Sequence, residues 1–457
     1  MNQWKLTVGM EIHVELETKT KMFCGCPNDP FHAEANTNVC PVCYGLPGAL
    51  PLLNKEAVMM VVRLGQALKA EVATESFWAR KNYFYPDLPK GYQISQSAKP
   101  LMVGGKVTID GADYHLHHAH LEEDAGKLMH APDKTHSLVN YNRAGVPLLE
   151  IVTEPDFHTA EAAKRFCQEL QRIMRSLKIS TADMEKGQLR CEANISVSQT
   201  DELGTKVEVK NINSFRAVEK AIEYEFERQV KALEAGETIQ HETRSWQETD
   251  GKTVVMRSKE TSADYRYFPE PDLPAVSILV GENAEHVLPD EKRQQLADWG
   301  ISDHEIARTI VDRGYFEDFK ELYRVYAIRE FKDPGLMQLA ANISLGNPEF
   351  IKLQPEEKLA LIELTTQNGW TKETVAEIIT KAIGETKSIA ELASEFTHGD
   401  DLTEVIEVVS FANQKAVADY RSGKENSFNF LVGQVMAKTQ GRANINTVRE
   451  ELKKALQ

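Results

Sequence analysis

The stretch WKLTVGMEIHVELE, residues 4–17, constrains the fold more than any other part of the chain. Its apolar residues stand at every second position from 6 to 16, which predicts a β-strand with one face on a hydrophobic core. The other face carries Glu11, His13 and Glu15. Side chains two residues apart on a strand are roughly 6 to 7 Å from each other at their Cα atoms, close enough for two of them to bind one ion or phosphate. The alternative is an edge strand whose polar face lies in water.

Similar alternation recurs up to about residue 285, in EANISVSQ, TKVEVKNI and KTVVMRSK, and predicts antiparallel strands. Apolar residues three or four apart predict helices at 55–70, 160–178 and 217–236, and helical periodicity dominates from about residue 288 onward. The fold class expected is therefore α+β, with one large antiparallel sheet followed by helices. We place the domain boundaries at 1–294, 295–405 and 406–457.

The formal charge of −16 argues against a protein that coats nucleic acid without specificity. Residues 411–457 nevertheless hold eight Lys or Arg against four acids, a net of +4, so the remainder carries −20. A basic end on an acidic body suits docking of a phosphate-bearing partner, or a solvated helical tail. There is no apolar run long enough to span a bilayer and no basic-then-apolar leader, so we expect a cytoplasmic protein without membrane contact.

Four cysteines give the sharpest local signal. Thirteen residues separate the pair Cys24 and Cys26 from the pair Cys40 and Cys43, a spacing that suits a tetrahedral zinc site. Two disulfides would need an oxidising compartment, and a redox CxxC would not need the second pair. Four thiolates leave no open position for water, so such a zinc would be structural.

Acidic residues suggest a second metal site. The stretch HAHLEEDAGKLMH holds Glu122 and Glu123, and VPLLEIV places Glu150 inside an apolar run, where an unpaired carboxylate is costly to bury. Together with Glu11 and His13 these residues would form an oxygen-rich set with one imidazole. Such a set suits Mg²⁺, and Mg²⁺ among carboxylates suggests phosphoryl transfer. The acidic stretch alone is equally typical of a solvated surface.

No P-loop and no dinucleotide-binding glycine fingerprint occurs, so a nucleotide site of either kind is not expected. The cationic candidates for holding phosphates are Arg80, Lys81, Arg190, Lys206, Lys210, Arg257, Lys259 and Arg266. Several stand beside Asn or aromatic residues, in RKNYFYP, KNINSF and DYRYFP. These aromatics could stack on a base, or pack in turns.

Seven stretches taken together resemble one family: VGMEIHVEL, TNVCPVCYGLPGALPLLN, RKNYFYPDLPKGYQISQ, HLEEDAGKL, NRAGVPLLEIVTEPD, GTKVEVKNINSFRAVEKAIEYE and DYRYFPEPDLP. They are similar to the B subunits of the aspartyl/glutamyl-tRNA amidotransferases, the GatB family. The match runs nearly continuously over residues 7–275. It returns in FNFLVGQVMAKTQGRANINTVREEL, which looks like the C-terminal tail domain of that family, whereas residues 300–400 match weakly.

The resemblance implies a specific activity. Family members work with an amidase subunit (A) and a small subunit (C), converting Glu-tRNA(Gln) to Gln-tRNA(Gln) and often Asp-tRNA(Asn) to Asn-tRNA(Asn). The GatB protein binds the misacylated tRNA, phosphorylates its side-chain carboxylate with ATP and Mg²⁺, and forms the amide with ammonia from the amidase. The catalytic fold of the family is similar to that of glutamine synthetase and guanidino kinases.

The resemblance also implies roles for residues. It makes Glu11, His13, Glu122, Glu123 and Glu150 metal ligands, with Glu15 spare. The ATP-binding candidates are Arg80, Lys81, Arg190, Lys206, Lys210 and Arg266. No amidase signature occurs in the chain, so ammonia must come from another subunit.

The chain departs from the family pattern at two points. Glu192 stands where the family often has Asp, and Ser198 where a basic residue is common. We therefore leave Glu192 out of the core set.

Two rival hypotheses remain. One is a non-catalytic, zinc-containing tRNA-binding scaffold. The other is a stand-alone metal-dependent hydrolase or ligase that acts on a small carboxylate.

Overall fold

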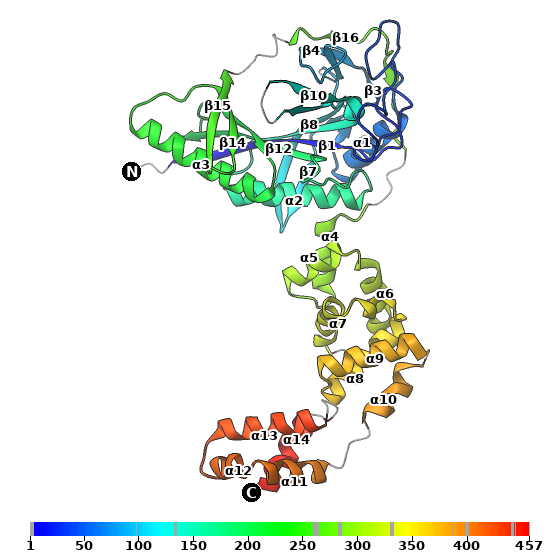
Figure 1. Ribbon diagram of the computed structural model, residues 1–457, viewed down its shortest axis with the longest axis vertical. Helices are drawn as coiled ribbons and strands as arrows, with labels where there is room; N and C mark the ends of the chain where they lie inside the picture. Colours follow the sequence, from blue (N-terminus) through cyan, green and yellow to red (C-terminus); the bar gives the residue numbers. More distant parts are fainter. Residues whose placement is uncertain are drawn as a thin grey trace. The chain divides into compact units, whose positions relative to one another are not determined.

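A computed structural model describes residues 4–96, 98–131, 135–258, 265–281, 286–329, 333–385, 387–397, 402–439, 443 and 445–456. The chain divides into two compact units, Met1–Asp290 and Glu291–Gln457. The first is a mixed α+β unit and the second is helical among its described residues (Figure 1). This agrees with the α+β class expected from the sequence.

The strands are β1 (Lys5–Glu15), β2 (Glu71–Val72), β3 (Glu75–Ser76), β4 (Ala79–Asn82), β5 (Tyr92–Ser95), β6 (Met102–Val103), β7 (Lys106–Ile109), β8 (Ala112–Glu123), β9 (Lys127–His130), β10 (Ser137–Asn140), β11 (Pro147–Thr153), β12 (Leu189–Ser198), β13 (Val207–Ile212), β14 (Glu242–Gln247), β15 (Lys252–Ser258), β16 (Phe268–Pro269) and β17 (Val276–Ser277). The helices of the first unit are α1 (Lys55–Ala67), α2 (Ala160–Ser176) and α3 (Phe215–Glu234). The predicted helices at 55–70, 160–178 and 217–236 are thereby confirmed to within three residues at either end.

One large sheet organises the first unit. Its strand order is β15-β14-β13-β12-β1-β11-β8-β6-β2, with β7 paired to β8. Strand β1 lies in the middle and pairs antiparallel with both β11 and β12, so it is not an edge strand. The expectation of a purely antiparallel sheet was wrong at one place, because β13 and β14 pair in parallel. The long helix α3 connects β13 to β14, and such a crossover lets two strands run in the same direction.

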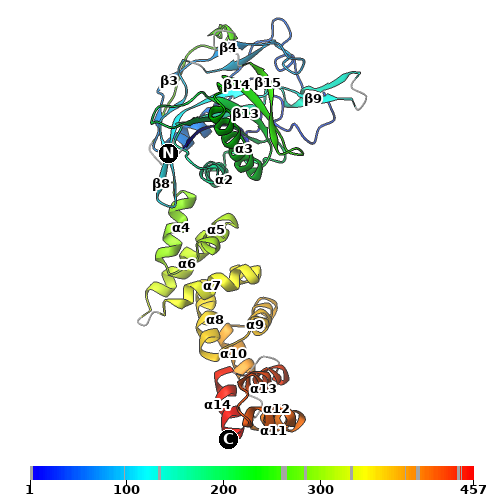
Figure 2. The ribbon, with the colours of Figure 1, turned by 90° about the vertical axis from the view of Figure 1, so that its left-hand side faces the viewer.

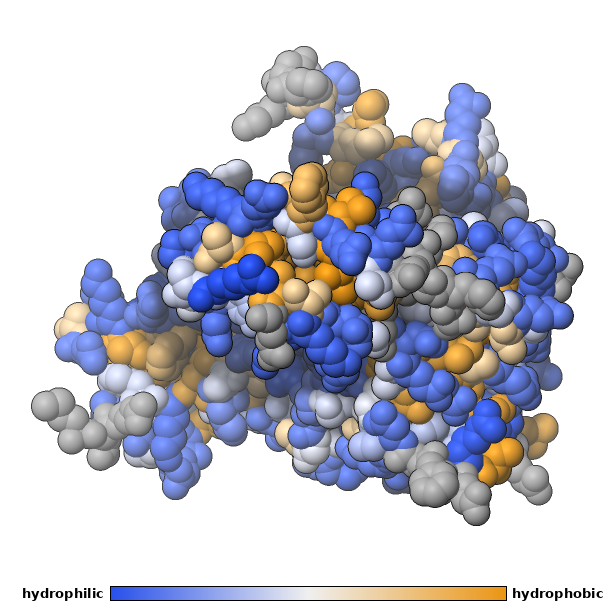
Figure 3. Space-filling view, turned by 90° about the horizontal axis from the view of Figure 1, so that it is seen from below, coloured by the Kyte–Doolittle hydropathy of each residue, from blue (hydrophilic) through white to orange (hydrophobic). Residues whose placement is uncertain are grey.

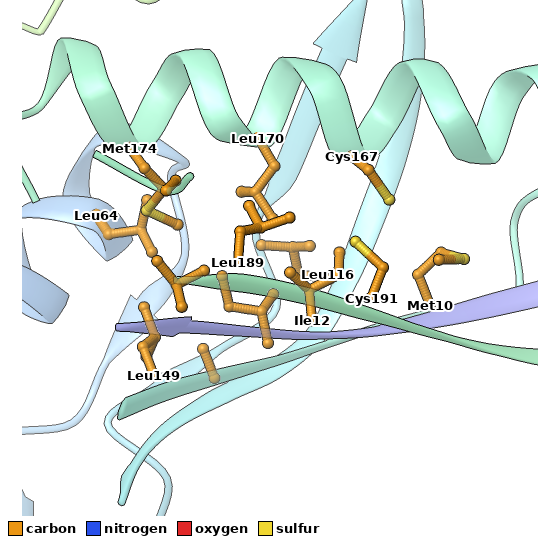
Figure 4. Packing of buried hydrophobic residues seen from close by; sticks show 14 of the residues in the cluster. Met10, Ile12, Leu64, Leu116, Leu149, Cys167, Leu170, Met174, Leu189 and Cys191 are labelled. Carbon is orange, nitrogen blue, oxygen red and sulfur yellow. The ribbon is translucent and has the colours of Figure 1, made fainter. Parts of the chain in front are cut away.

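The two faces of this sheet differ in chemistry. Helices α2 and α3 run along one face in Figure 1, and Figure 4 shows Cys167, Leu170 and Met174 of α2 above Ile12 and Leu189. These side chains belong to one large buried hydrophobic cluster. The apolar half of the β1 alternation therefore faces the helices, and the polar half faces the opposite side of the sheet.

Capping residues determine where the helices α2 and α3, which cover the sheet, begin. Thr159 caps α2, because its hydroxyl accepts a hydrogen bond from the backbone N–H of Ala162 at 3.1 Å. Ser214 caps α3 in the same way through Ala217, at 3.0 Å. Both caps satisfy backbone donors that a helix N-terminus leaves unpaired.

The second unit consists of short helices. They are α4 (Pro289–Asp298), α5 (His304–Asp312), α6 (Phe316–Ala327), α7 (Gly335–Gly346), α8 (Pro355–Asn368), α9 (Lys372–Glu385), α10 (Ile389–Thr397), α11 (Leu402–Ala412), α12 (Gln414–Arg421), α13 (Glu425–Lys438) and α14 (Ile445–Leu456). Its buried hydrophobic residues form two clusters, one between Leu296 and Phe396 and one between Ile406 and Leu456. These clusters support our proposal of separate domains at 295–405 and 406–457.

No helix among the described residues is long and apolar enough to cross a membrane. On the face shown in Figure 3, hydrophilic residues are spread between small hydrophobic patches.

Candidate functional site

The polar face of the large sheet gathers acids and imidazoles from neighbouring strands. In the β-ladder His13 stands opposite Glu150 of β11, and Glu150 stands opposite His120 of β8. Directly opposed residues in antiparallel strands point to the same face. Glu122, two residues beyond His120, therefore points to that face as well. Residues separated by more than a hundred positions in sequence thus form one row.

Distances within the row are short. The Nε2 atom of His13 lies 3.4 Å from Oε2 of Glu150 and 3.7 Å from Oε1 of Glu122. The Nε2 atom of His120 lies 3.4 Å from Oε2 of Glu150 and 3.8 Å from Oε2 of Glu122. Glu11, His13 and Glu150 each offer a ligand atom within 4.8 Å of the others, as do His120, Glu122 and Glu150. Both groups can hold a metal ion.

Protonation in this row reflects crowded charge. Burial, followed by the charge of Glu150, raises the pKa of Glu11 to about 7. Burial alone would lower the pKa of His13, but its hydrogen bond to Glu150 and the carboxylate charges around it raise that pKa to about 9. The same balance raises the pKa of His120 to about 10, again mainly through Glu150. Protons on Glu11, His13 and His120 therefore offset the negative charge of the carboxylates, and a divalent cation at the same place would offset it better.

His120 was not in the set expected from the sequence, although it lies within the acidic stretch. Its ring stacks on that of His118 at 5.4 Å between centroids, and its Nδ1 atom is buried without a hydrogen-bond partner. Its spacing could have identified it, because His120 and Glu122 are two residues apart on one strand and therefore face the same side.

The strands β4 and β5 supply the other side of the site. Ser95 of β5 donates a hydrogen bond to Oε2 of Glu122 at 3.3 Å. Lys81 of β4 has its Nζ atom 5.1 Å from the ring centre of Tyr265. Burial disfavours the charged ammonium, but the charges of Glu122 and Glu150 outweigh burial and raise the pKa of Lys81. Lys81 is therefore the expected phosphate-binding cation that faces the carboxylate row.

Two similar sequence segments meet beside Lys81. Strand β16, within YRYFPEPDLP, pairs antiparallel with β4, within NYFYPDLP, so that Phe268 stands opposite Arg80. The ring of Tyr83 lies 6.3 Å from that of Tyr265. Phe84 is 86% exposed, so it is not one of the packed turn aromatics.

Glu123 does not lie with the other carboxylates. On β8 the residues Ala119 and Leu121 face the hydrophobic core, so alternation turns Glu123 away from the row that holds Glu122. Its Oε1 atom accepts hydrogen bonds from the backbone N–H of Ile94 at 3.0 Å and from the ammonium of Lys90. The structure thus pairs Glu123 with a lysine.

Glu15, expected to be spare, lies in a buried charge cluster at the end of β1. The guanidinium of Arg190 pairs with Asp124 and lies 3.8 Å from Oε1 of Glu15. Arg143 lies 3.6 Å from Asp124. Burial, followed by the charge of Asp124, raises the pKa of Glu15 to about 8. Arg190 is therefore engaged by acids of the chain itself.

Glu192, left out of the core set, lies in the site. It stands opposite Glu11 in the β1–β12 ladder, and Glu11, Glu192 and Glu208 form a third group of close carboxylates. Lys210 donates a hydrogen bond to Glu192 at 2.5 Å and lies 3.5 Å from Glu208. The extra methylene of Glu192 does not keep it away from Glu11, because the register of the strands decides which residues meet. Glu208 carried no sequence signal of its own.

Of the remaining cationic candidates, Arg80 is engaged by an acid of the chain and two others are exposed. Arg80 donates two hydrogen bonds to the buried Glu270, at 2.7 and 2.9 Å. Lys206 and Arg266 are exposed. Lys259 and the side chain of Arg257 fall outside the described residues.

Four thiols form a separate candidate metal centre. The Sγ atoms of Cys24, Cys26, Cys40 and Cys43 all lie within 4.8 Å of one another, and none forms a disulfide. Four thiolates at the usual zinc distance of about 2.3 Å lie roughly 3.8 Å apart, and the Sγ atoms of Cys40 and Cys43 are 3.8 Å apart. A hydrogen bond from Cys24 lowers the pKa of Cys43 to about 5. The donor set and spacing fit zinc.

These features define a class: a mixed α+β protein that gathers metal-type ligands on the polar face of one sheet and carries a separate helical part. Comparison with known proteins identifies the family. Residues 6–281 match the model of the GatB/GatE catalytic domain, and residues 338–456 match that of the GatB domain. The chain therefore belongs to the GatB family.

Curated relatives share one description, the B subunit of aspartyl/glutamyl-tRNA(Asn/Gln) amidotransferase. The protein so described from Thermotoga maritima is 42% identical over 482 residues, which cover 100% of this chain and 99% of the relative. The one from Roseiflexus castenholzii is 41% identical, with 99% of both chains covered. The one from Symbiobacterium thermophilum is 40% identical, with 97% of this chain and 96% of the relative covered. The similarity thus extends over the whole length and includes residues 300–400.

Proposed function

We propose that this chain is the subunit of a tRNA-dependent amidotransferase that converts Glu-tRNA(Gln) to Gln-tRNA(Gln), Asp-tRNA(Asn) to Asn-tRNA(Asn), or both. It binds the misacylated tRNA, phosphorylates the side-chain carboxylate with ATP and Mg²⁺, and forms the amide with ammonia. The observation that carries the proposal is the row of Glu11, His13, Glu150, His120 and Glu122 on three adjacent strands, in a chain of this family.

The chemistry explains why such a row is useful. A carboxylate is a poor electrophile because its oxygen leaves badly, whereas an acyl phosphate offers ammonia a good leaving group. Forming that acyl phosphate brings the anionic carboxylate up to the phosphates of ATP. Magnesium supplies the charge neutralisation that this approach requires. The residues of the chain hold the ions and orient the two anions.

Three groups of ligands support this role. Glu11, His13 and Glu150 would hold one Mg²⁺ ion, and Glu122 extends the set through the shared Glu150. Glu192 and Glu208 add a carboxylate-rich position beside Glu11. Hard oxygen ligands of this kind suit Mg²⁺. Glu123 is paired with Lys90, so its carboxylate does not extend this ligand set.

Cations beside the row would bind phosphate oxygens. Lys81 has no ion-pair partner among the described residues and faces Glu122 and Glu150, so it is free to contact a phosphate. Lys210 and Arg190 are held in place by acids and would act by orienting groups around them.

Zinc at the four cysteines would be structural, because four thiolates fill its coordination. The similarity of the catalytic unit to glutamine synthetase and guanidino kinases is part of the same proposal, supported by the large mixed sheet. The amidase subunit (A) and the small subunit (C) are the proposed partners, with the amidase as the ammonia source. The cytoplasm is the proposed location, since aminoacyl-tRNA is used where translation takes place.

An amidation assay tests the proposal. The purified complex of the three subunits is incubated with Glu-tRNA(Gln) or Asp-tRNA(Asn), ATP, Mg²⁺ and glutamine. We expect amidated tRNA from at least one substrate, together with ADP formation that depends on the misacylated tRNA. A tRNA-binding scaffold would show no such ADP formation, and a stand-alone ligase would turn over without the partner subunits.

A further inference from the structure

Lys21 is a fully buried lysine just before the cysteine loop, residues 24–43, and it packs against that loop. Its exposed fraction is 0%, which makes it one of the largest completely buried side chains of the chain. Its backbone N–H donates to the carbonyl of Cys26 at 2.9 Å, and the next residue, Met22, donates to the carbonyl of Gly145 at 2.7 Å. These bonds fix Lys21 between the cysteine loop and the segment that leads into β11.

The ammonium of Lys21 has an unusual set of neighbours. Its Nζ atom donates to the carbonyl of Asn38 at 2.9 Å and lies 3.8 Å from Sγ of Cys43. Within the part of the chain that the structure describes, no carboxylate lies within ion-pair distance of Lys21. A buried ammonium is costly unless a negative group lies beside it. Cys43 is the group that meets this requirement.

Four thiolates around one zinc ion carry a net charge of −2, since four negative charges meet two positive ones. One buried ammonium would reduce this to −1. A pair of disulfides does not offer the same match, because disulfide sulfurs are neutral and would leave Lys21 without a counter-charge.

We propose that Lys21 is the counter-charge of the four-cysteine centre and a positioning residue for its zinc ion, through Sγ of Cys43. The inference rests on the zinc site of the proposed function and extends it to a residue outside the ligand set. Partners of metal ligands typically change metal affinity by about 10- to 100-fold when they are removed. Loss of the Lys21 charge therefore weakens zinc binding while leaving all four cysteines in place.

The link from Lys21 to Asn38 gives the charge a fixed position. Asn38 receives a second constraint, because its backbone N–H donates to Oδ1 of Asn142 at 3.0 Å. Asn142 in turn donates from Nδ2 to the carbonyl of Glu34 at 2.8 Å. The carbonyl of Asn38 is thus held in place, so Lys21 cannot swing away from Cys43 without losing its hydrogen bond to that carbonyl.

The test measures zinc itself. The full chain is prepared as wild type, Lys21→Met and Lys19→Met, and zinc release into an excess of a chromogenic chelator is followed over time. Methionine keeps much of the length of the lysine side chain without its charge. Lys19 is exposed on the same segment, so Lys19→Met removes an equal charge outside the loop interior.

We expect one zinc ion per wild-type chain, release at least about tenfold faster from Lys21→Met, and a wild-type rate for Lys19→Met. Release from Lys21→Met at the wild-type rate overturns the inference and leaves the zinc site intact. A wild-type chain that binds no zinc overturns the zinc site and the inference together.

A second variant, Lys21→Gln, controls for a folding defect in Lys21→Met. Its side chain is one bond shorter than that of lysine but keeps an N–H donor for the carbonyl of Asn38 while it removes the charge, and circular dichroism establishes whether each variant is folded. Folded Lys21→Gln should also release zinc at least about tenfold faster than wild type. A wild-type rate in that variant would likewise contradict the role of Lys21.

Discussion

Replacing Glu150 by Gln removes the negative charge shared by the two imidazoles of the row. The carboxylate lies 3.4 Å from both His13 and His120. It is the largest of the groups that raise the pKa of His13 from 6.5 to about 9. Because one pKa unit corresponds to about 1.4 kcal/mol, this rise reflects about 3 kcal/mol of net attraction for one positive charge by all the carboxylates around His13, after the cost of burial. A divalent cation at the same place feels at least as much.

Because Glu150 is the largest contributor to that attraction, we expect Glu150→Gln to weaken Mg²⁺ binding by at least roughly 10-fold and up to roughly 100-fold, the factor that corresponds to about 3 kcal/mol. The assay is ADP formation by the three-subunit complex with Glu-tRNA(Gln), measured over a series of Mg²⁺ concentrations. Phosphorylation should be lost at ordinary Mg²⁺, whereas tRNA affinity, measured by filter binding, should stay within a few fold.

Glu17→Gln is the matched control, since Glu17 is exposed just beyond the end of β1. An unchanged Mg²⁺ dependence in Glu150→Gln would refute the assignment of Glu150 as a ligand. Loss of tRNA binding instead of phosphorylation would show that the row serves the tRNA rather than the metal.

Four further outcomes are expected. His13→Ala should abolish phosphorylation and leave tRNA affinity nearly unchanged; retained phosphorylation would remove His13 from the site. Mg²⁺ binding should strengthen as pH rises from 6 to 9, because the ion must displace protons held on Glu11, with a pKa of about 7, and on His13, with a pKa of about 9. Calorimetry in two buffers of different ionisation enthalpy measures that proton release, and none would contradict the assignment. Deletion of residues 411–457 should weaken tRNA binding and flatten its salt dependence in titrations at several salt concentrations, whereas equal affinity would exclude a docking role. Cys40→Ser should reduce both zinc content and melting temperature, and full zinc retention would argue against a four-cysteine site.

The alternation of β1 was enough to predict which of its residues face the core. It correctly separated Ile12 from His13, because a period of two leaves no other choice for a half-buried strand. The same rule, applied to β8, would have separated Glu122 from Glu123. Treating HLEED as one acidic run instead of an alternating strand hid that difference.

Register could not be predicted in this way. Glu192 meets Glu11, and His120 meets Glu150, because of how β12, β1, β11 and β8 align. Alignment depends on contacts between segments far apart in sequence, and no single strand encodes it. The parallel pair β13–β14 was missed for the same reason, since either direction gives the same local pattern.

The cysteine loop was predicted only in part. Its spacing predicts that four thiols can meet, and the structure brings them within 4.8 Å of one another. The buried Lys21 beside them had no sequence signal, because a lysine among polar loop residues is usually exposed. Only its complete burial next to Cys43 distinguishes it.

Ions bound by the row on the polar face of the sheet are proposed to allow ATP to activate the aminoacyl group. The most direct measurement is anomalous diffraction from crystals grown with a non-hydrolysable ATP analogue and Mn²⁺ in place of Mg²⁺. We expect a Mn²⁺ peak ligated by Glu11, His13 and Glu150, with the phosphates of the analogue beside Lys81. Phosphates and Mn²⁺ bound elsewhere in the chain, with these side chains contacting only one another, would contradict it.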